Sequence, residues 1–137
     1  MEVTGLGSAI LNFSLYFALS VSALIIFKAV FPLITPHNEW ELIKEKQNVA
    51  ASIAFGGAIL GYAIALYGAA SNSVDLIDFV IWMGIAFLAQ MIAFAIIRFI
   101  FMPKVVARIE NNEVSAGIIV AAFSIAVGLL NAACMTY

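Results

Sequence analysis

Four long stretches without a charged side chain constrain this chain more than any other feature. They are residues 3–27, 47–74, 79–97 and 114–137. A helix needs about 20 apolar residues to cross the hydrocarbon core of a bilayer, and each stretch holds a run of about that length. Strands of a membrane barrel would alternate apolar and polar residues, and these runs do not alternate. The sequence therefore predicts four transmembrane helices, at about residues 9–31, 49–70, 79–101 and 114–137.

The composition excludes most classes of soluble protein. Hydrophobic residues make up 65% of the chain and charged residues 10%, with a mean hydropathy of +1.12. A typical soluble domain has about 45–50% hydrophobic and about 25% charged residues. A chain this short cannot bury the additional apolar surface in a soluble core. With 6 Lys and Arg against 8 Asp and Glu, no basic field exists for a nucleic-acid partner. We expect one all-α membrane domain over residues 1–137, with the lipid bilayer as its main partner.

The basic residues predict the orientation of the spans. All six lie in or beside the loops that follow the first and third spans: Lys28, Lys44, Lys46, Arg98, Lys104 and Arg108. Cytoplasmic loops carry an excess of Lys and Arg, so we expect these two loops in the cytoplasm and both termini outside. No basic residue precedes the first apolar run, unlike in a signal peptide, so the first span is expected to stay in the protein.

The second half of the chain resembles the first. Residues 49–53 resemble residues 114–118, at an offset of 65, and each segment begins a span. Residues 27–31 and 97–101 each place a basic residue in an apolar helix end. Each unit is a helical hairpin with the same orientation, which makes the repeat parallel rather than inverted. We expect two hairpin repeats, at about residues 9–70 and 76–137.

The two cytoplasmic loops and their borders carry residues that suit a membrane interface. Asn38 favours a helix start, and Trp40 suits a short helix lying at the interface; the second loop repeats the pattern after Pro103. Lys28 and Arg98 lie close to the cytoplasmic ends of their spans, where long side chains can reach the headgroups. We expect Trp40, Lys28 and Arg98 to be interfacial anchors. The alternatives are a docking surface for a cytoplasmic partner and a role for the two cations in permeation or gating.

Small residues dominate the second and fourth spans. In lipid, helices associate through close approach of their backbones, which small residues four positions apart allow. We expect these spans to pack together, in one chain or between copies, through Ala54, Gly57, Gly61, Gly117, Ala121 and Gly128. The first and third spans instead carry aromatic residues that we expect to face lipid: Phe13, Phe17, Phe27, Phe87, Phe94, Phe99 and Phe101.

A few polar residues interrupt the apolar spans. The ones of most interest are Asn12, Ser20, Gln90 and Asn131. They either hydrogen-bond between helices or line a narrow polar path. The sequence shows no catalytic set and no metal-ligand pattern, so we expect no enzyme activity, no cofactor and no metal site. For Cys134 we favour a buried small residue over a partner in an intermolecular disulfide.

Several strings resemble the YjfL-type bacterial inner-membrane proteins, a family of unknown function. They are residues 35–43 (TPHNEWELI), 48–51 (NVAA), 56–58 (GGA), 108–111 (RIEN), 116–117 (AG) and 128–136 (GLLNAACMT). The resemblance covers nearly the whole chain and implies a four-helix protein of the bacterial inner membrane, without established catalytic residues. One departure is Gln47, which stands where the family has a glycine before Asn48.

Two classes of function remain open. The first, which we favour, is a small channel or transporter of unknown substrate whose path forms between copies, because four helices barely enclose a polar path. The second is a structural or accessory subunit, in envelope stress or membrane organisation, that assembles with membrane or cytoplasmic partners. The first hypothesis favours an oligomer, and the second allows assembly with further copies or with other partners; we expect a homo-oligomer.

Overall fold

The chain folds into four long helices joined by short connections. The computed structural model describes residues 3–34 and 39–135, which contain no strand. The long helices are α1 (Val3–Ile34), α3 (Val49–Asn72), α4 (Leu76–Ile96) with its continuation as the π-helix η1 (Ile97–Phe101), and α6 (Val114–Cys134). The two basic connections hold the short helices α2 (Glu39–Lys44) and α5 (Val105–Glu110). Four segments are long and apolar enough to cross a membrane, so the predicted all-α membrane fold is confirmed. The hairpin repeat stays a prediction.

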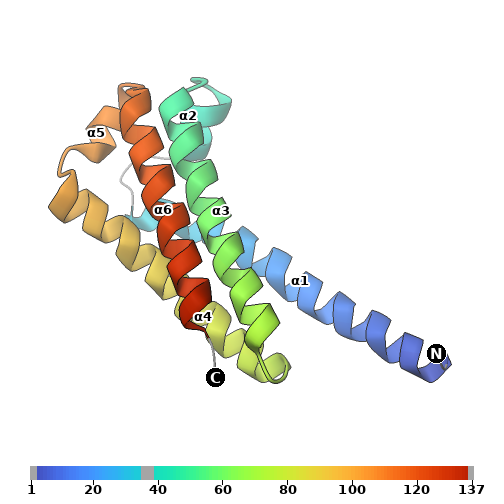
Figure 1. Cartoon of the computed structure of the whole chain (residues 1–137). Coiled ribbons are helices and arrows are strands. Elements are labelled where there is room, and N and C mark those ends of the chain that lie inside the picture. The colour runs from blue at the N-terminus through green and yellow to red at the C-terminus, as the bar shows by residue number, and fades with distance from the viewer. Residues whose placement is uncertain (1–2, 35–38, 136–137) are drawn as a thin grey trace.

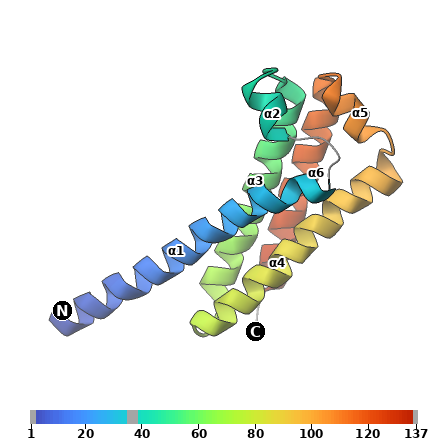
Figure 2. The ribbon, with the colours of Figure 1, turned by 180° about the vertical axis from the view of Figure 1, so that it is seen from behind.

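The long helices form two layers (Figure 1). α3 and α6 lie side by side in one layer, and α1 and α4 run behind them, as the view from the other side shows (Figure 2). α4 contacts both α3 and α6, whereas α1 packs mainly on α3 and α4. α2 and α5 cap one end of the bundle, and the turn between α3 and α4 lies at the other end. The N-terminal half of α1 extends away from the other helices.

α1 is too long to cross a bilayer at right angles. Its 32 residues correspond to about 48 Å at about 1.5 Å per residue, against a hydrocarbon core about 30 Å thick. Tilting removes such a mismatch, and α1 runs obliquely to α3 and α6 (Figure 1). Leu11, Phe13 and Phe17 are 61%, 66% and 59% exposed. The N-terminal half of α1 therefore offers an uncovered apolar surface to lipid or to another chain.

Side-chain caps begin α3 and α4. Asn48 Oδ1 accepts a hydrogen bond from Ala51 N at 2.8 Å, and Asp75 Oδ1 accepts one from Asp78 N at 2.8 Å. Asp78 Oδ2 in turn accepts one from Val74 N at 2.9 Å. These bonds satisfy backbone donors that a helix start leaves without an intrahelical partner. Both helix starts are thus encoded by residues next to them in the sequence.

Aromatic side chains form much of the core, which corrects the expectation that the phenylalanines face lipid. Phe27, Phe31 and Phe94 are buried. Phe27 stacks on Tyr62 with ring centroids 5.0 Å apart, and Phe31 lies edge-on to Phe94, also at 5.0 Å. Phe87 packs half-buried against this cluster, because aromatic rings gain from stacking with one another. The members of the predicted set that are exposed are Phe13, Phe17, Phe99 and Phe101.

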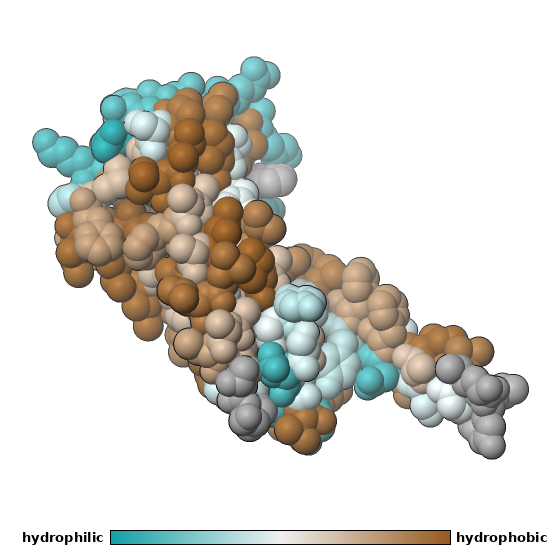
Figure 3. All heavy atoms as spheres, viewed as in Figure 1, coloured by the Kyte–Doolittle hydropathy of each residue, from teal (hydrophilic) through white to brown (hydrophobic). Residues whose placement is uncertain are grey.

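Polar side chains gather at the two ends of the bundle. On the face shown in Figure 3, hydrophilic residues cover the end with α2 and α5 and a zone near the turn between α3 and α4, with an apolar belt between them.

The turns before α3 and α6 each place one residue in the left-handed region, Gln47 at φ 50° and Asn112 at φ 58°. Asn adopts this conformation more readily than Gln. Glycine, which Gln47 replaces in the YjfL-type pattern, adopts it without strain.

Candidate functional site

α3 and α6 pack with their backbones in direct contact. A Cβ added to Gly57 would overlap Ala121, and one added to Gly128 would overlap the carbonyl of Gly61. Such approaches allow Cα–H···O=C contacts and are a common reason for small residues in membrane helices. The residues predicted to pack lie in these two helices, and all are buried except the half-buried Ala121: Ala54, Gly57, Gly61, Gly117, Ala121 and Gly128.

Two side-chain amides tie α4 to α6. Gln90 Nε2 of α4 donates to Ser124 O of α6 at 3.2 Å, and Asn131 Nδ2 of α6 donates to Ala86 O of α4 at 3.3 Å. Within a membrane such a bond contributes about 0.6–2 kcal/mol. The structure therefore brings Gln90 and Asn131, two of the residues considered for a polar path, to one interface, which we call the amide seam.

The carbonyl oxygen of Gln90 is the unusual atom of the amide seam. Gln90 is 5% exposed, and its Oε1 has no hydrogen-bond donor among the described residues. The residue lies near the middle of the span Leu76–Phe101. Leaving a buried acceptor unsatisfied costs about 1–3 kcal/mol, so native proteins keep few such groups without a reason. An amide oxygen can accept a hydrogen bond from water or a polar solute, and it can also bind a hard cation.

The other two residues considered for a polar path lie on α1. Asn12 is exposed and lines a recess of about 460 Å³ with Tyr16 and Ser73, beside the C-terminal end of α3. The Ser20 hydroxyl donates to Tyr16 O of its own helix at 2.7 Å. Within one protomer, the structure thus places the four polar residues as two pairs, one on α1 and one at the amide seam.

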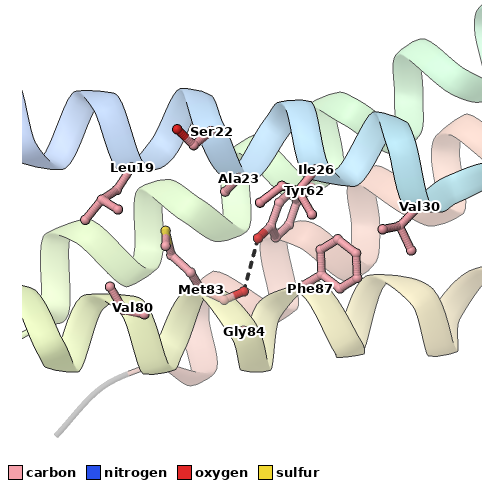
Figure 4. Close-up of a pocket in the computed structure, with 10 residues that line it drawn as sticks. All are labelled: Leu19, Ser22, Ala23, Ile26, Val30, Tyr62, Val80, Met83, Gly84 and Phe87. Carbon is pink, nitrogen blue, oxygen red and sulfur yellow. Dashed lines mark hydrogen bonds between the residues drawn. The ribbon is translucent and has the colours of Figure 1, made fainter.

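An apolar groove of about 340 Å³ lies between α1, α3 and α4 (Figure 4). Leu19 and Ala23 of α1 line one side, and Met83 and Gly84 of α4 line the other. The hydroxyl of Tyr62 reaches across from α3 and donates to Met83 O at 3.1 Å. The walls are almost entirely hydrocarbon, so the groove suits an acyl chain rather than a polar solute. Tyr62 was not anticipated, although a single phenol in mid-span was an available signal.

The predicted anchors take different environments. The Arg98 guanidinium carbon lies 4.9 Å from the centroid of the Phe99 ring, within cation–π distance. Lys28 is exposed and lies six residues, nearly two turns, before the end of α1 at Ile34. Trp40 belongs to α2, but its side chain, like residues 35–38 with the proposed start at Asn38, lies outside the described part. Cys134 is an exposed free thiol, which corrects the expectation of a buried residue.

The connections before α3 and α6 hydrogen-bond to each other. Asn48 Nδ2 donates to Ile109 O at 2.8 Å, and Ala50 N donates to Asn112 Oδ1 at 3.0 Å. Asn48 is buried, and both atoms of its amide are bonded because Oδ1 also caps α3. This junction was not anticipated. Its only signal in the sequence was an asparagine close before each of the two small-residue spans.

The chain is similar to several bacterial membrane proteins. The family described as Domain of Unknown Function (DUF350) matches residues 4–135. The UPF0719 inner membrane protein YjfL of Escherichia coli (strain K12) is 45% identical over 129 residues, which cover 94% of this chain and 96% of that protein. The UPF0719 transmembrane protein YshE of Bacillus subtilis (strain 168) is 34% identical over 115 residues, which cover 83% of this chain and 84% of that protein. No solved structure matches the chain.

A more distant relative is longer than this chain. The UPF0719 transmembrane protein of Aquifex aeolicus (strain VF5) is 27% identical over 129 residues, which cover 88% of this chain and 48% of that protein. The match over nearly the whole chain and the four membrane-length helices confirm the resemblance drawn from the sequence. The chain belongs to the DUF350 family of UPF0719 proteins and is an integral protein of the inner membrane.

Proposed function

We propose that this protein is a non-enzymatic, oligomeric membrane protein of the channel or transporter type, in which a small polar solute or cation passes close to Gln90. The observation that carries the proposal is the buried, unpartnered Oε1 of Gln90 near the middle of its span. Lipid offers this oxygen no hydrogen-bond donor. Water, a polar solute or a cation would satisfy it, and each of these has to enter from an aqueous side.

The packing of one protomer favours a path that needs movement or a second copy. α3 and α6 are in backbone contact, and the amide seam joins α4 to α6. The seam bonds of Gln90 and Asn131 are long, at 3.2 and 3.3 Å, near the upper limit for such bonds. A modest shift of α4 against α6 would break them and open the surroundings of Gln90.

The proposal includes an orientation. It places α2, α5 and the basic connections in the cytoplasm and both termini in the periplasm. It is supported by the confinement of all six basic residues to α1, η1 and these two connections, none of them in the turn between α3 and α4, as the positive-inside rule requires.

Flux measurements on Gln90 variants test the proposed function. The purified protein is placed in vesicles of phosphatidylethanolamine and phosphatidylglycerol, with radioactive rubidium as the cation probe and urea as the neutral probe. We expect flux of at least one probe, and Gln90→Leu should lower it tenfold or more, because it removes the acceptor and keeps the volume similar. Asn131→Leu is the matched comparison: it removes a seam bond and leaves Oε1 of Gln90 in place, so flux should stay at the parent's level or rise. No flux of either probe, or equal flux in Gln90→Leu and the parent, contradicts the proposal.

A second candidate is an accessory subunit that acts in envelope stress or membrane organisation. It is favoured by a recess of about 330 Å³ at the basic end of the bundle, lined by Phe101, Pro103, Lys104 and Arg108. An aromatic ring beside Lys104 suits an acidic peptide of a cytoplasmic partner; Arg108 already forms an ion pair with Glu113 at 3.3 Å. An absence of flux, combined with loss of a copurifying protein in Lys104→Glu, would favour this function over transport.

A further inference from the structure

The two helices of the α3–α6 layer correspond at an offset of 65 residues. α3 begins at Val49 and α6 begins at Val114. The residue two positions before each start has a positive φ, Gln47 before α3 and Asn112 before α6. Each helix also follows a six-residue helix, α2 or α5. The two helices therefore enter the bundle through the same local geometry.

Two buried positions of α3 recur in α6 at the same offset. Ala51 and Phe55 of α3 are 0% and 4% exposed, and their counterparts Ala116 and Val120 of α6 are both 0% exposed. Phe55 contacts Phe31 of α1, so this side of α3 faces the layer of α1 and α4. At these two pairs, residues 65 apart occupy corresponding buried sides of α3 and α6.

Within the chain, one side of α3 packs on one side of α6. The α3 residues in this contact are Ala50, Gly57, Gly61 and Gly68, and the α6 residues are Gly117, Ala121, Ser124, Gly128 and Ala132. The counterparts of the α3 set lie on α6 and are all exposed; we call them the outer face of α6: Ser115, Ala122, Ala126 and Ala133. The counterparts of the α6 set lie on α3 and are exposed or half-buried; we call them the outer face of α3: Ser52, Gly56, Ile59, Ala63 and Tyr67.

The two outer faces therefore have mostly the small side chains of the contact that exists inside the protomer, with Ile59 and the exposed Tyr67 as larger exceptions. A Cβ added to Gly56 would meet no atom within 4 Å, although its neighbour Gly57 is in contact with Ala121. Small residues that face lipid contribute nothing through their size. When another helix packs against them, they stabilise the contact because the two backbones can approach closely.

We propose that a second copy of this chain covers these faces, with the outer face of α6 in one copy packed on the outer face of α3 in the next. The contact between copies then repeats the α3–α6 contact within a copy. Both helices run away from the end that carries α2 and α5 (Figure 1), so the neighbour keeps its membrane orientation. Such a head-to-tail contact closes into a ring when the rotation between copies permits it.

The position of α1 supports this arrangement. α4 covers the junction between α3 and α6 and contacts both. α1 corresponds to α4 in the first half, and it contacts α3 but extends beyond it with its N-terminal half (Figures 1 and 2). In the proposed assembly, α6 of the neighbouring copy lies beside α3, where the exposed Phe13 and Phe17 of α1 would cover the new junction. The interface is independent of the proposed transport function.

Cysteine cross-linking in native membranes tests the interface. In a Cys134→Ser background, Gly56→Cys and Ala122→Cys mark the counterparts of the contact between Gly57 and Ala121. A disulfide between these positions within one chain would leave a monomer on the gel, so a ladder reports only contacts between copies. Oxidation of the double variant should give a ladder of dimers, trimers and larger species on non-reducing gels. Each single variant should stay monomeric.

The controls separate this contact from others. Gly56→Cys combined with Ile92→Cys, an exposed position on α4, should give no ladder. Ala126→Leu should lower the mass of the detergent-extracted particle and leave the unfolding of the protomer unchanged, because Ala126 is exposed in one copy. A monomer band alone from the double variant, or equal dimer yield from Gly56→Cys alone, would overturn the proposed interface. Since cross-linking is read without flux, its failure and a failure of transport are separate results.

Discussion

Two neighbouring glycines test how much the contact between α3 and α6 stabilises the protomer. A Cβ on Gly57 would overlap both Cα and Cβ of Ala121, whereas a Cβ on Gly56 would meet no atom within 4 Å. The residues are adjacent in one helix, so a change from glycine to alanine adds the same atoms at nearly the same membrane depth. The two variants differ only in what the new methyl group meets.

The magnitude follows from the distance that the helices must move. For Gly57→Ala, carbon atoms that overlap have to separate to about 3.5–4.0 Å, which moves α3 and α6 apart by at least about 1 Å. A gap of this size forfeits about a quarter to a half of the attraction across it, and it weakens Cα–H···O=C contacts of about 0.5–1 kcal/mol each. Overpacking of this kind costs about 1–3 kcal/mol. Both variants gain up to about 1 kcal/mol of helix propensity, and only for Gly57→Ala does overpacking oppose this gain.

We therefore expect Gly57→Ala to lower the free energy of unfolding by about 1–3 kcal/mol, and Gly56→Ala to leave it unchanged or raise it slightly. Unfolding is followed in mixed micelles with increasing dodecyl sulfate, by circular dichroism and tryptophan fluorescence. The measurement uses a detergent concentration at which the parent is monomeric, so that contacts between copies do not contribute. Equal midpoints for the two variants would refute the close packing of α3 on α6.

The same titration tests the turns and the aromatic core, and a fusion experiment tests the orientation. Gln47→Gly should raise the free energy of unfolding by about 0.5–1 kcal/mol, because glycine adopts the positive φ without strain. Asn112→Gly should lower the free energy of unfolding, because Asn112 also accepts a backbone hydrogen bond. Shifts of the same sign in the two variants would contradict this account. Tyr62→Phe should lower the free energy by about 1 kcal/mol through its lost hydrogen bond, with ring stacking kept; no change would mean that the bond contributes nothing. Reporter enzymes fused after Asn111 and after Tyr137 should report opposite compartments, and matching signals would exclude the proposed orientation.

Span positions could be predicted from the sequence because they depend on local quantities. A run of apolar residues and the charges that bound it determine where a helix can cross the membrane, and α3, α4 with η1, and α6 lie close to the predicted ranges. The burial of Phe27 and Phe94 could not be predicted in this way. Lipid is as apolar as a protein core, so hydrophobicity does not indicate which side of a helix turns inward.

The partners of the polar residues could not be predicted for a related reason. Gln90 bonds to a residue 34 positions away and Asn131 to one 45 positions away, so their pairing depends on the register of whole helices. Ser20, by contrast, bonds within its own helix, which is a local event. The unpartnered oxygen of Gln90 is a property of three packed helices, and the sequence alone contains no signal that separates it from a satisfied amide.

The junction between the two basic connections has a consequence for biosynthesis. Asn48 and Ala50 precede their partners by 61 and 62 residues, and a ribosome that adds about 5–20 residues per second needs about 3–12 s to make them. During that interval the residues of α3 are already made, but the carbonyl of Ile109 and the side-chain amide of Asn112 do not yet exist. α1 and α3 therefore enter the membrane before the start of α3 has these two hydrogen bonds. The junction forms only after synthesis has passed α5 and Asn112. A nascent chain stalled before Ile109 should leave the start of α3 exchanging its amide hydrogens far faster than in the finished protein.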